Sequence, residues 1–315
     1  MGQETARPTD APGGSRPAGG PPVDGLKAAL GPFGIFSHEL RSEDPAQQDR
    51  IRRAAADVEN LGFGAIWLGG SSSVRHAAHL AASTDHVVLA TGILNIWFED
   101  AHSVAAQRAD LERSDPGRFL LGLGASHAAL ARDYRRPYST MVEYLDALDA
   151  AAPPVPADRR VLAALGPKML GLSRDRAAGA HPYLVTPEYL EQARGILGPE
   201  PLLAPEVTVV LDDDPATARA TARGFLGYYL GLPNYAANLK RLGYTDDDLA
   251  DAGSDRLVDA LVVRGTDDTI HHRLRQFLAA GADHLALQVI TASGDSEPPL
   301  PQWRRLAALT SGLTR

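Results

Sequence analysis

The chain has 315 residues, a formal net charge of −8 and no cysteine, which excludes disulfide bonds, zinc–thiolate centres and cysteine nucleophiles. Acidic side chains outnumber basic ones and no Lys/Arg cluster offers a patch for phosphates, so we expect no nucleic-acid partner. No apolar run approaches the roughly 20 residues that a membrane-spanning helix needs, so we expect no membrane partner.

The N-terminal segment differs in composition from the rest of the chain. Residues 6–22, ARPTDAPGGSRPAGGPP, are rich in proline and glycine and lack apolar periodicity, so burial cannot offset the entropy of ordering them. We expect a disordered tail over residues 1–24 and one domain over residues 25–315. The tail also lacks the apolar core of a secretory signal, which favours a cytoplasmic location.

Short apolar runs, typical of strands, alternate with segments of helical periodicity from residue 32 onward. Local signals mark several helix starts: Asp44 and Thr266 stand at N-cap positions, and Pro45 stands at a first helical position. We expect strands at residues 32–36, 64–70, 86–94, 118–124, 160–165, 181–185, 206–211 and 283–290. We expect helices at residues 45–61, 73–82, 101–114, 138–151, 167–178, 186–196, 215–230 with a helical excursion to about 250, 267–280 and 299–312.

This alternation predicts an α/β fold, a (β/α)8 barrel. The strands are nearly continuous apolar runs, as parallel strands covered on both faces should be, and eight strand–helix units suit a barrel better than a doubly wound sheet. The stretch RFLLGLGASH (118–127) could instead form a dinucleotide loop, but its G-x-G-x-x-H pattern lacks the third glycine and lies in the fourth unit. As a barrel strand, it points Gly124 to His127 toward the catalytic face.

Two further groups could carry chemistry. His38 follows the first strand and should lie at the barrel mouth, where an imidazole with a pKa near 6.5 suits proton transfer; the alternative is a solvated histidine in the polar loop. Gly166 allows close backbone approach at a helix N-terminus that attracts anions, and Lys168 adds positive charge, unless this is a plain turn. His76 and His79 have the spacing of metal ligands, but no third ligand accompanies them, so we expect no metal.

Five stretches resemble the luciferase-like monooxygenase superfamily. They are NLGFGAIWLGG (60–70), VVLATGILNIW (87–97), DPGRFLLGLGASH (115–127), VLAALGPKMLGLS (161–173) and GAHPYLVTPEY (179–189). The resemblance extends over about residues 32–290 and is strongest to the deazaflavin-dependent oxidoreductases of actinobacteria. It implies a (β/α)8 barrel, in agreement with the strand count, and a homodimer that acts on a small-molecule substrate.

The resemblance also implies that the ring of reduced FMN, or of the 8-hydroxy-5-deazaflavin called coenzyme F420, lies across the barrel mouth. A non-prolyl cis peptide bond in the third strand supports one face of that ring, and matching motif to motif places it at Gly92–Ile93. His38 and His127 would be the catalytic residues, although relatives often carry an acidic or polar residue at the position of His127. The cofactor-binding residues would be Gly92, Ile93, Asn95, Gly124, Ala125, Ser126, Ala164, Leu165, Gly166, Pro167, Lys168 and Met169.

We therefore expect an F420-dependent oxidoreductase that transfers a hydride between deazaflavin C5 and an unknown substrate. An FMN-dependent luciferase-like monooxygenase is the first alternative, because no motif separates the two cofactors. A barrel that binds flavin without catalysis is the second, because Gly69 and Gly70 stand where many relatives carry a carboxylate; these glycines would also leave room for a bulky or apolar substrate. Tyr228, Tyr229 and Tyr235 could line the barrel mouth, but core packing suffices to explain them, and barrel packing is also the favoured explanation for residues 181–183.

Overall fold

The computed structural model describes residues 23–128, 131, 134–294 and 297–313. Residues 1–22 of the expected tail lie outside the described residues, and helix α1 (Val23–Leu30) begins two residues before the expected domain boundary. Leu26 and Leu30 of α1 are buried in one apolar cluster with Trp67 from the barrel interior, so α1 belongs to the domain. Within the described ranges, no helix is long and apolar enough to cross a bilayer.

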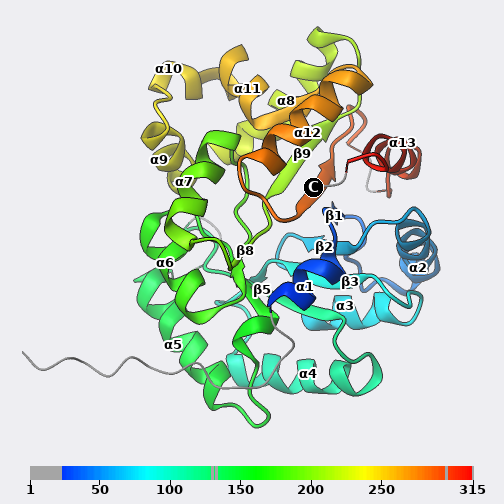
Figure 1. Cartoon of the computed structure of the whole chain (residues 1–315), viewed down its shortest axis with the longest axis vertical. Helices are drawn as coiled ribbons and strands as arrows, with labels where there is room; N and C mark the ends of the chain where they lie inside the picture. Colours follow the sequence, from blue (N-terminus) through cyan, green and yellow to red (C-terminus); the bar gives the residue numbers. More distant parts are fainter. Residues whose placement is uncertain (1–22, 129–130, 132–133, 295–296, 314–315) are drawn as a thin grey trace, which may run out of the picture.

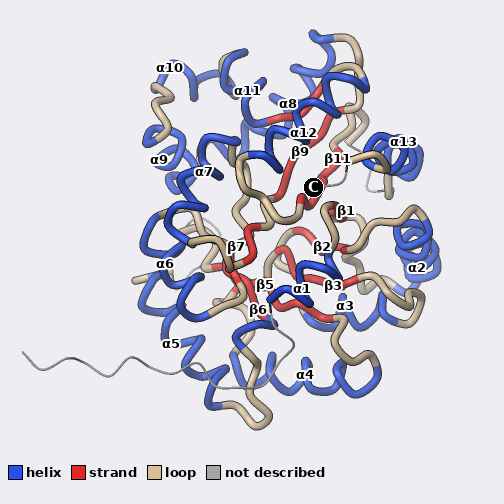
Figure 2. Tube along the Cα trace, in the orientation of Figure 1, coloured by secondary structure: helices blue, strands red, loops and turns tan. Residues whose placement is uncertain are grey.

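The strands form the centre of the molecule and the helices surround them (Figures 1 and 2). All strand pairs are parallel, and β11 pairs with β1, so the first and last strands lie side by side. The ring is completed where β8, which pairs with β7, continues into β9, which pairs with β11, and this confirms the predicted barrel. The strands are β1 (Phe33–Ser37), β2 (Ala65–Gly69), β3 (Val88–Gly92), β4 (Leu94–Asn95), β5 (Phe119–Gly124), β6 (Arg160–Leu162), β7 (Gly179–Ala180), β8 (Leu202–Leu203), β9 (Glu206–Val210), β10 (Val262–Arg264) and β11 (Leu285–Val289).

The helices begin close to the predicted starts because their capping residues act as expected. The side chain of Asp44 accepts a hydrogen bond from the Ala46 N–H at 2.9 Å, and Thr266 caps the start of its helix in the same way. The expected excursion after residue 230 is a group of short helices, α9 to α11. The helices after α1 are α2 (Pro45–Asn60), α3 (Val74–Ala81), α4 (Ala101–Ser114), α5 (Pro137–Ala150), α6 (Pro167–Arg176), α7 (Pro187–Leu197), α8 (Pro215–Leu230), α9 (Pro233–Arg241), α10 (Asp246–Leu249), α11 (Asp255–Leu261), α12 (Asp267–Ala279) and α13 (Leu300–Thr310).

A bulge interrupts the third barrel strand between β3 and β4. The register against β5 changes by one residue from the β3 pairs to the β4 pairs, so the β3–β4 side carries one extra residue. The peptide bond Gly92–Ile93 inside the bulge is cis, which confirms the predicted geometry.

The facing strand accommodates this bulge through a glycine. The Thr91 hydroxyl accepts a hydrogen bond from the Gly122 N–H and donates one to the Gly122 carbonyl, both at 2.8 Å. A Cβ atom on Gly122 would lie 1.9 Å from the Thr91 carbonyl oxygen. The close approach of the two backbones therefore requires glycine at this position.

One expectation about the later strands is wrong, and two short strands, β8 and β10, were not expected. The sixth strand is β7 rather than residues 181–185, because Pro182 has no N–H for a neighbouring strand and Leu184 has a φ of 52°. The seventh strand is divided at Pro205 into β8 and β9. β8 pairs with β7, whereas β9 pairs with β11 and with β10, a short strand that the sequence reading missed.

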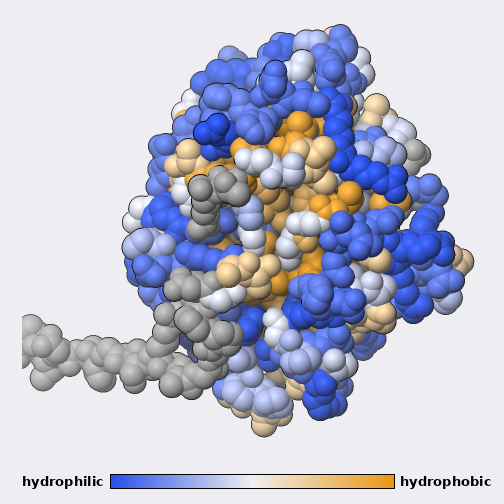
Figure 3. Space-filling view, turned by 45° about the vertical axis from the view of Figure 1, so that its right-hand side comes forward, coloured by the Kyte–Doolittle hydropathy of each residue, from blue (hydrophilic) through white to orange (hydrophobic). Residues whose placement is uncertain are grey.

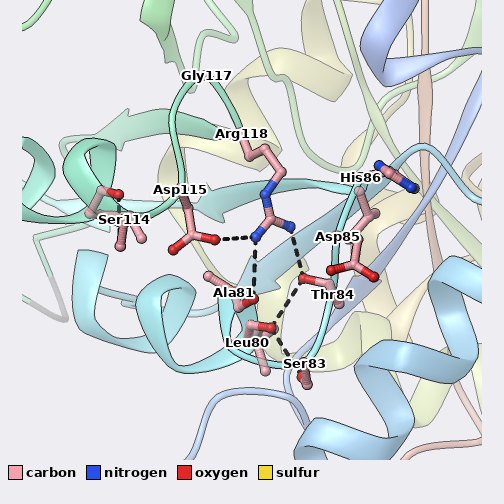
Figure 4. Close-up of polar contacts among 12 residues, drawn as sticks. Leu80, Ala81, Ser83, Thr84, Asp85, His86, Ser114, Asp115, Gly117 and Arg118 are labelled. Atoms are coloured by element: carbon pink, nitrogen blue, oxygen red, sulfur yellow. Dashed lines mark hydrogen bonds and ion pairs between the residues drawn. The ribbon is translucent and has the colours of Figure 1, made fainter.

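A polar cluster holds the N-terminal end of β5 (Figure 4). The Arg118 guanidinium donates to the Thr84 hydroxyl at 3.0 Å, to the Ala81 carbonyl at 3.2 Å and to the Asp115 carboxylate. These bonds tie the loop before β3 to the loop before β5. A surface cavity is lined by the same residues, and because the Arg118 and Asp115 charges already pair with each other, we assign this cluster a structural role.

Candidate active site

A cavity of about 530 Å³ lies at the carboxyl ends of the barrel strands, where barrels of this type hold their active sites. The face shown in Figure 3 has apolar residues gathered in a central hollow with hydrophilic residues around it, the usual form of a small-molecule site. Of the predicted site residues, the cavity lining includes His38, His127, Gly92, Ile93, Gly124, Ala125, Ser126, Ala164, Leu165, Gly166 and Met169. Their roles toward a cofactor stay predictions.

Two glycines shape the floor of the cavity. A Cβ atom on Gly92 would lie 2.7 Å from Cε2 of Phe36, and one on Gly124 would lie 2.5 Å from Cδ1 of Ile93. Phe36 therefore packs directly against the bulge, and Ile93 packs directly over the neighbouring strand. The floor is apolar, and neither glycine adds a side chain to it.

Asn95 does not line the cavity, contrary to the sequence-based expectation. Its side chain is 2% exposed, and its Oδ1 accepts a hydrogen bond from the Trp97 N–H at 3.1 Å, so it stabilises the turn after β4. The Trp97 indole N–H in turn donates to the Ala125 carbonyl at 2.6 Å. This contact joins the loops after the third and fourth strands and holds Ala125 at the cavity edge.

The positive charge predicted at the start of α6 is also placed differently. Gly166, the N-cap of α6, lines the cavity and has open space around its Cβ position, whereas Pro167 and Lys168 are exposed and lie outside the lining. Arg241, at the end of α9, lines the cavity instead. Sequence reasoning missed Arg241 because the fold brings it to the barrel mouth from a helix far along the chain.

His38 lines the cavity from the end of β1. Burial lowers its pKa from the usual 6.5, and the neighbouring Glu39 carboxylate opposes this shift. A Cβ atom on Gly69 would lie 2.6 Å from Cε1 of Phe36 and 2.9 Å from Nδ1 of His38. The space that the sequence reading assigned to a substrate at Gly69 is therefore filled by these two rings, and at Gly70 the Arg41 guanidinium lies nearby.

His127 reaches the same cavity from the end of β5. Its ring centroid is 5.0 Å from that of Tyr235, and burial lowers its pKa from 6.5. His38 also borders a second, more polar cavity of about 770 Å³ that reaches Gln288 and Thr291. Among the described residues, no three His, Asp or Glu side chains lie close enough together to hold a metal ion.

Three tyrosines, Tyr183, Tyr229 and Tyr235, form one wall of the cavity, where core packing was the favoured expectation. The Tyr183 hydroxyl donates to Oε1 of Gln288 at 2.8 Å, and it lies 3.2 Å from the Tyr229 hydroxyl, from which it can accept. The Tyr229 and Tyr235 rings meet edge to face with centroids 5.7 Å apart. Burial raises the pKa of all three phenols, so they stay neutral. The crowding of tyrosines around the junction of α8 and α9 was the signal in the sequence.

His181 was likewise expected to serve packing alone, and it lines the cavity. Its ring is 2% exposed and stacks on Trp67, with centroids 4.1 Å apart and planes at 10°. Burial lowers its pKa to about 4, so the ring is neutral at ordinary pH. Only the tertiary fold reveals this placement, because His181 lies just beyond the end of β7 and not within a strand.

One buried carboxyl group lies near the tyrosine wall. Glu206 is 1% exposed and its Oε1 accepts a hydrogen bond from the Thr208 hydroxyl at 2.6 Å. Burial raises its pKa to about 8, so the group is protonated at neutral pH. Glu206 is therefore no anionic partner for a substrate.

The barrel, the bulge with its cis bond and the apolar cavity agree with the fold expected from the sequence. Residues 32–284 match the description of the luciferase-like monooxygenase family, and the chain belongs to that family. The family consists of enzymes that catalyse oxidation and reduction.

Individual relatives agree with this assignment. The chain is 26% identical to a Mycobacterium tuberculosis protein whose name gives it, provisionally, as a coenzyme F420-dependent oxidoreductase; the match covers 81% of this chain and 92% of that protein. The solved structure of an F420-dependent secondary alcohol dehydrogenase with an F420–acetone adduct has a TM-score of 0.68 at 14% identity and covers 90% of this chain and 99% of its own. A Pseudomonas putida 3,6-diketocamphane monooxygenase with FMN has a TM-score of 0.62 at 16% identity, covering 89% and 97%.

Proposed function

We propose that the protein is a coenzyme F420-dependent oxidoreductase acting on a small organic substrate. The observation that carries the proposal is the apolar floor at Gly92, Ile93 and Gly124, which suits a planar ring, beside two neutral histidines. Similarity to the mycobacterial relative over most of both chains supports F420 as the ring. When bound, F420 supplies a two-electron carrier that gives or takes a hydride at C5.

The residues around the floor suit the parts of such a coenzyme. Gly92, Ile93 and Gly124 would support the ring, and the loop residues from Ala164 to Met169 would contact its side chain. The N-terminus of α6 at Gly166 offers backbone N–H groups and the positive end of the helix dipole to an anionic group. Arg241 supplies the cationic side chain in the cavity lining.

The histidines provide the proton chemistry in this proposal. Burial favours the neutral form of His38, so its imidazole can take a proton from a substrate hydroxyl and return it in the reverse reaction. His127 is the second candidate for this role. The tyrosine wall of Tyr183, Tyr229 and Tyr235 limits the access of water to the reacting carbon.

An FMN-dependent monooxygenase is the second candidate function, because a relative of the same fold is solved with FMN. Titration of the purified protein with F420 and with FMN, followed by fluorescence quenching, separates the two. We expect F420 to bind more tightly and reduced F420 to be oxidised by some members of a panel of ketones, imines and activated alkenes. Tighter FMN binding with oxygen consumption would favour the monooxygenase.

The remaining outcomes of this titration also decide between proposals. Binding of either ring without turnover of any substrate favours a non-catalytic flavin-binding barrel, and failure to bind both rings contradicts the proposal. A homodimer and a cytoplasmic location stay predictions. Sedimentation of the purified protein tests the first, and fractionation of the source cells tests the second.

A further inference from the structure

One ring nitrogen of His181 has a hydrogen-bond partner, and the other lies toward Gly92, a residue of the cavity lining. Its Nδ1 lies 2.7 Å from the Ala204 carbonyl oxygen. A carbonyl can only accept, so Nδ1 carries the proton and donates. In a neutral imidazole the other nitrogen, Nε2, then has a free lone pair and no proton.

Within the described residues, Nε2 of His181 is buried and has no hydrogen-bond partner. A Cβ atom on Gly92 would lie 3.4 Å from Nε2, so this nitrogen faces the bulge at the cavity floor. Buried polar atoms are seldom left unpaired in native proteins, and such an atom in a ligand cavity marks a position where a ligand donor fits.

The neighbouring donors are already committed. The Trp67 indole N–H, next to His181 in the stack, donates to Nε2 of His284 at 3.0 Å. The Tyr183 hydroxyl donates its one proton to Gln288. Phe36, the other ring stacked near His181, has no polar atom on its side chain.

His284 provides an internal comparison. It lies in the same aromatic group, with its ring centroid 5.9 Å from that of Trp67, and it is fully buried. Both of its ring nitrogens have partners, Nδ1 with the Gly31 carbonyl at 2.8 Å and Nε2 with Trp67. The two histidines are thus alike in burial and differ in that only His181 presents a free acceptor to the cavity.

We propose that Nε2 of His181 accepts a hydrogen bond from an N–H or O–H group on the planar ring that binds over Gly92 and Ile93. The inference rests on the proposed function and adds the group by which the cavity floor recognises the ring. A ring that has only hydrogen-bond acceptors or methyl groups at the position facing Nε2 should bind more weakly. In a deazaflavin the candidate donors are the N3–H of the pyrimidinedione and the 8-hydroxyl, whereas a flavin has the N3–H but a methyl group at position 8.

The test measures ring binding, without turnover, in three variants. His181→Asn keeps an N–H near Nδ1 for the Ala204 carbonyl and removes the atom at Nε2; His181→Gln keeps an acceptor near Nε2. His284→Asn is the matched control for loss of a buried imidazole. We expect His181→Asn to raise the Kd of the deazaflavin nucleoside about tenfold, in the range for loss of one buried hydrogen bond. We expect His181→Gln to recover part of this loss and His284→Asn to leave Kd unchanged while lowering Tm.

Modified rings identify the donor. If N3–H is the donor, methylation of N3 weakens binding of the ring to the wild type and causes no additional loss of affinity in His181→Asn. Riboflavin, which also has the N3–H, then binds His181→Asn more weakly than the wild type, as the deazaflavin does. If the 8-hydroxyl is the donor, the 8-methoxy deazaflavin binds the wild type more weakly than the deazaflavin does and loses no further affinity in His181→Asn. Riboflavin then binds the wild type and His181→Asn equally well. Equal Kd values for wild type and His181→Asn with a ring that binds overturn the inference and leave the proposed function intact.

A second measurement keeps the inference testable if the variants do not fold. The ¹⁵N resonance of Nε2 in the wild type should move toward hydrogen-bonded values when the ring is added, and the Nδ1 resonance should stay in place. An unchanged Nε2 resonance in the ring-bound protein contradicts the inference. If neither flavin nor deazaflavin binds the wild type, the proposed function fails and this inference fails with it.

Discussion

Replacement of Gly124 by alanine should impair ring binding while leaving the barrel folded. A Cβ atom at this position would lie 2.5 Å from Cδ1 and 2.7 Å from Cγ1 of Ile93, and 3.4 Å from the Ala163 Cβ. The nearest atoms belong to the far end of one side chain. Ile93 must therefore move by about 1 Å to regain ordinary contact, and because the strand blocks one side, it moves toward the space assigned to the ring.

The expected magnitude follows from the cost of overpacking. Forcing one extra methyl group into a packed site costs about 1–3 kcal/mol, and if the ring meets the displaced Ile93, that range raises Kd about five- to 150-fold. Stability changes less, because free Gly124→Ala protein can let Ile93 relax into the cavity. We expect a fall in Tm of only a few degrees, since each kcal/mol shifts Tm by roughly 2–4 °C in larger domains.

The assay is F420 titration by fluorescence quenching, together with thermal unfolding of the same samples. The double variant Gly124→Ala with Ile93→Ala is the control, because it removes both Ile93 atoms that the new methyl group would meet. It should bind better than Gly124→Ala alone. Wild-type affinity in Gly124→Ala, or a double variant no better than the single one, would refute the reasoning about the floor.

Three further changes test other parts of the structure. Gly122→Ala should unfold the domain or lower its Tm far more than Gly124→Ala does, because the new atom meets the Thr91 backbone oxygen at 1.9 Å, which thermal unfolding checks. His38→Ala should bind F420 nearly as well as the wild type but turn over about 10² to 10⁴ times more slowly; it should also lose a pH-profile limb below 6.5, and full activity would exclude this base. Glu206 titrates near 4.5 when unfolded and at about 8 when folded, so its stabilising effect is complete below pH 4.5 and is lost as pH rises through 8. Glu206→Gln should therefore gain Tm relative to the wild type between pH 5 and pH 9, and a constant difference would contradict the raised pKa.

Local signals predicted the helices well, because caps act within one turn of the chain. Asp44 and Thr266 each stand directly before the helix that they cap. The sixth strand was misplaced because His181 to Val185 is an apolar run like the true strands, and only the missing N–H of Pro182 argued against pairing. Helix α1 was missed because Val23 to Leu30 directly follows the proline-rich segment and its apolar face becomes evident only against the barrel.

The candidate site was predictable where residues at strand ends share one edge of the sheet, as Gly92, Gly124 and His38 do. The site was not predictable where the direction of a side chain decides whether the residue lines the cavity. Asn95 lies close to the bulge in sequence, yet its side chain turns back toward the Trp97 N–H. Arg241 and the tyrosine wall come from α8, α9 and the segment after β7, and no local pattern relates these segments to the third strand.

The break at Pro205 has a consequence for how this enzyme could diversify. The lower part of the seventh strand, β8, joins β7 and closes the barrel, whereas the upper part, β9, turns to β10. The segment after β7, which carries Tyr183, is thereby released from the strand ladder above the level of Pro182. Substitutions and short insertions there can remodel the tyrosine wall of the cavity without breaking the hydrogen bonds that close the barrel. New substrate preferences should arise in this segment more readily than in the floor, where an added side chain at Gly92 or Gly124 would meet Phe36 or Ile93.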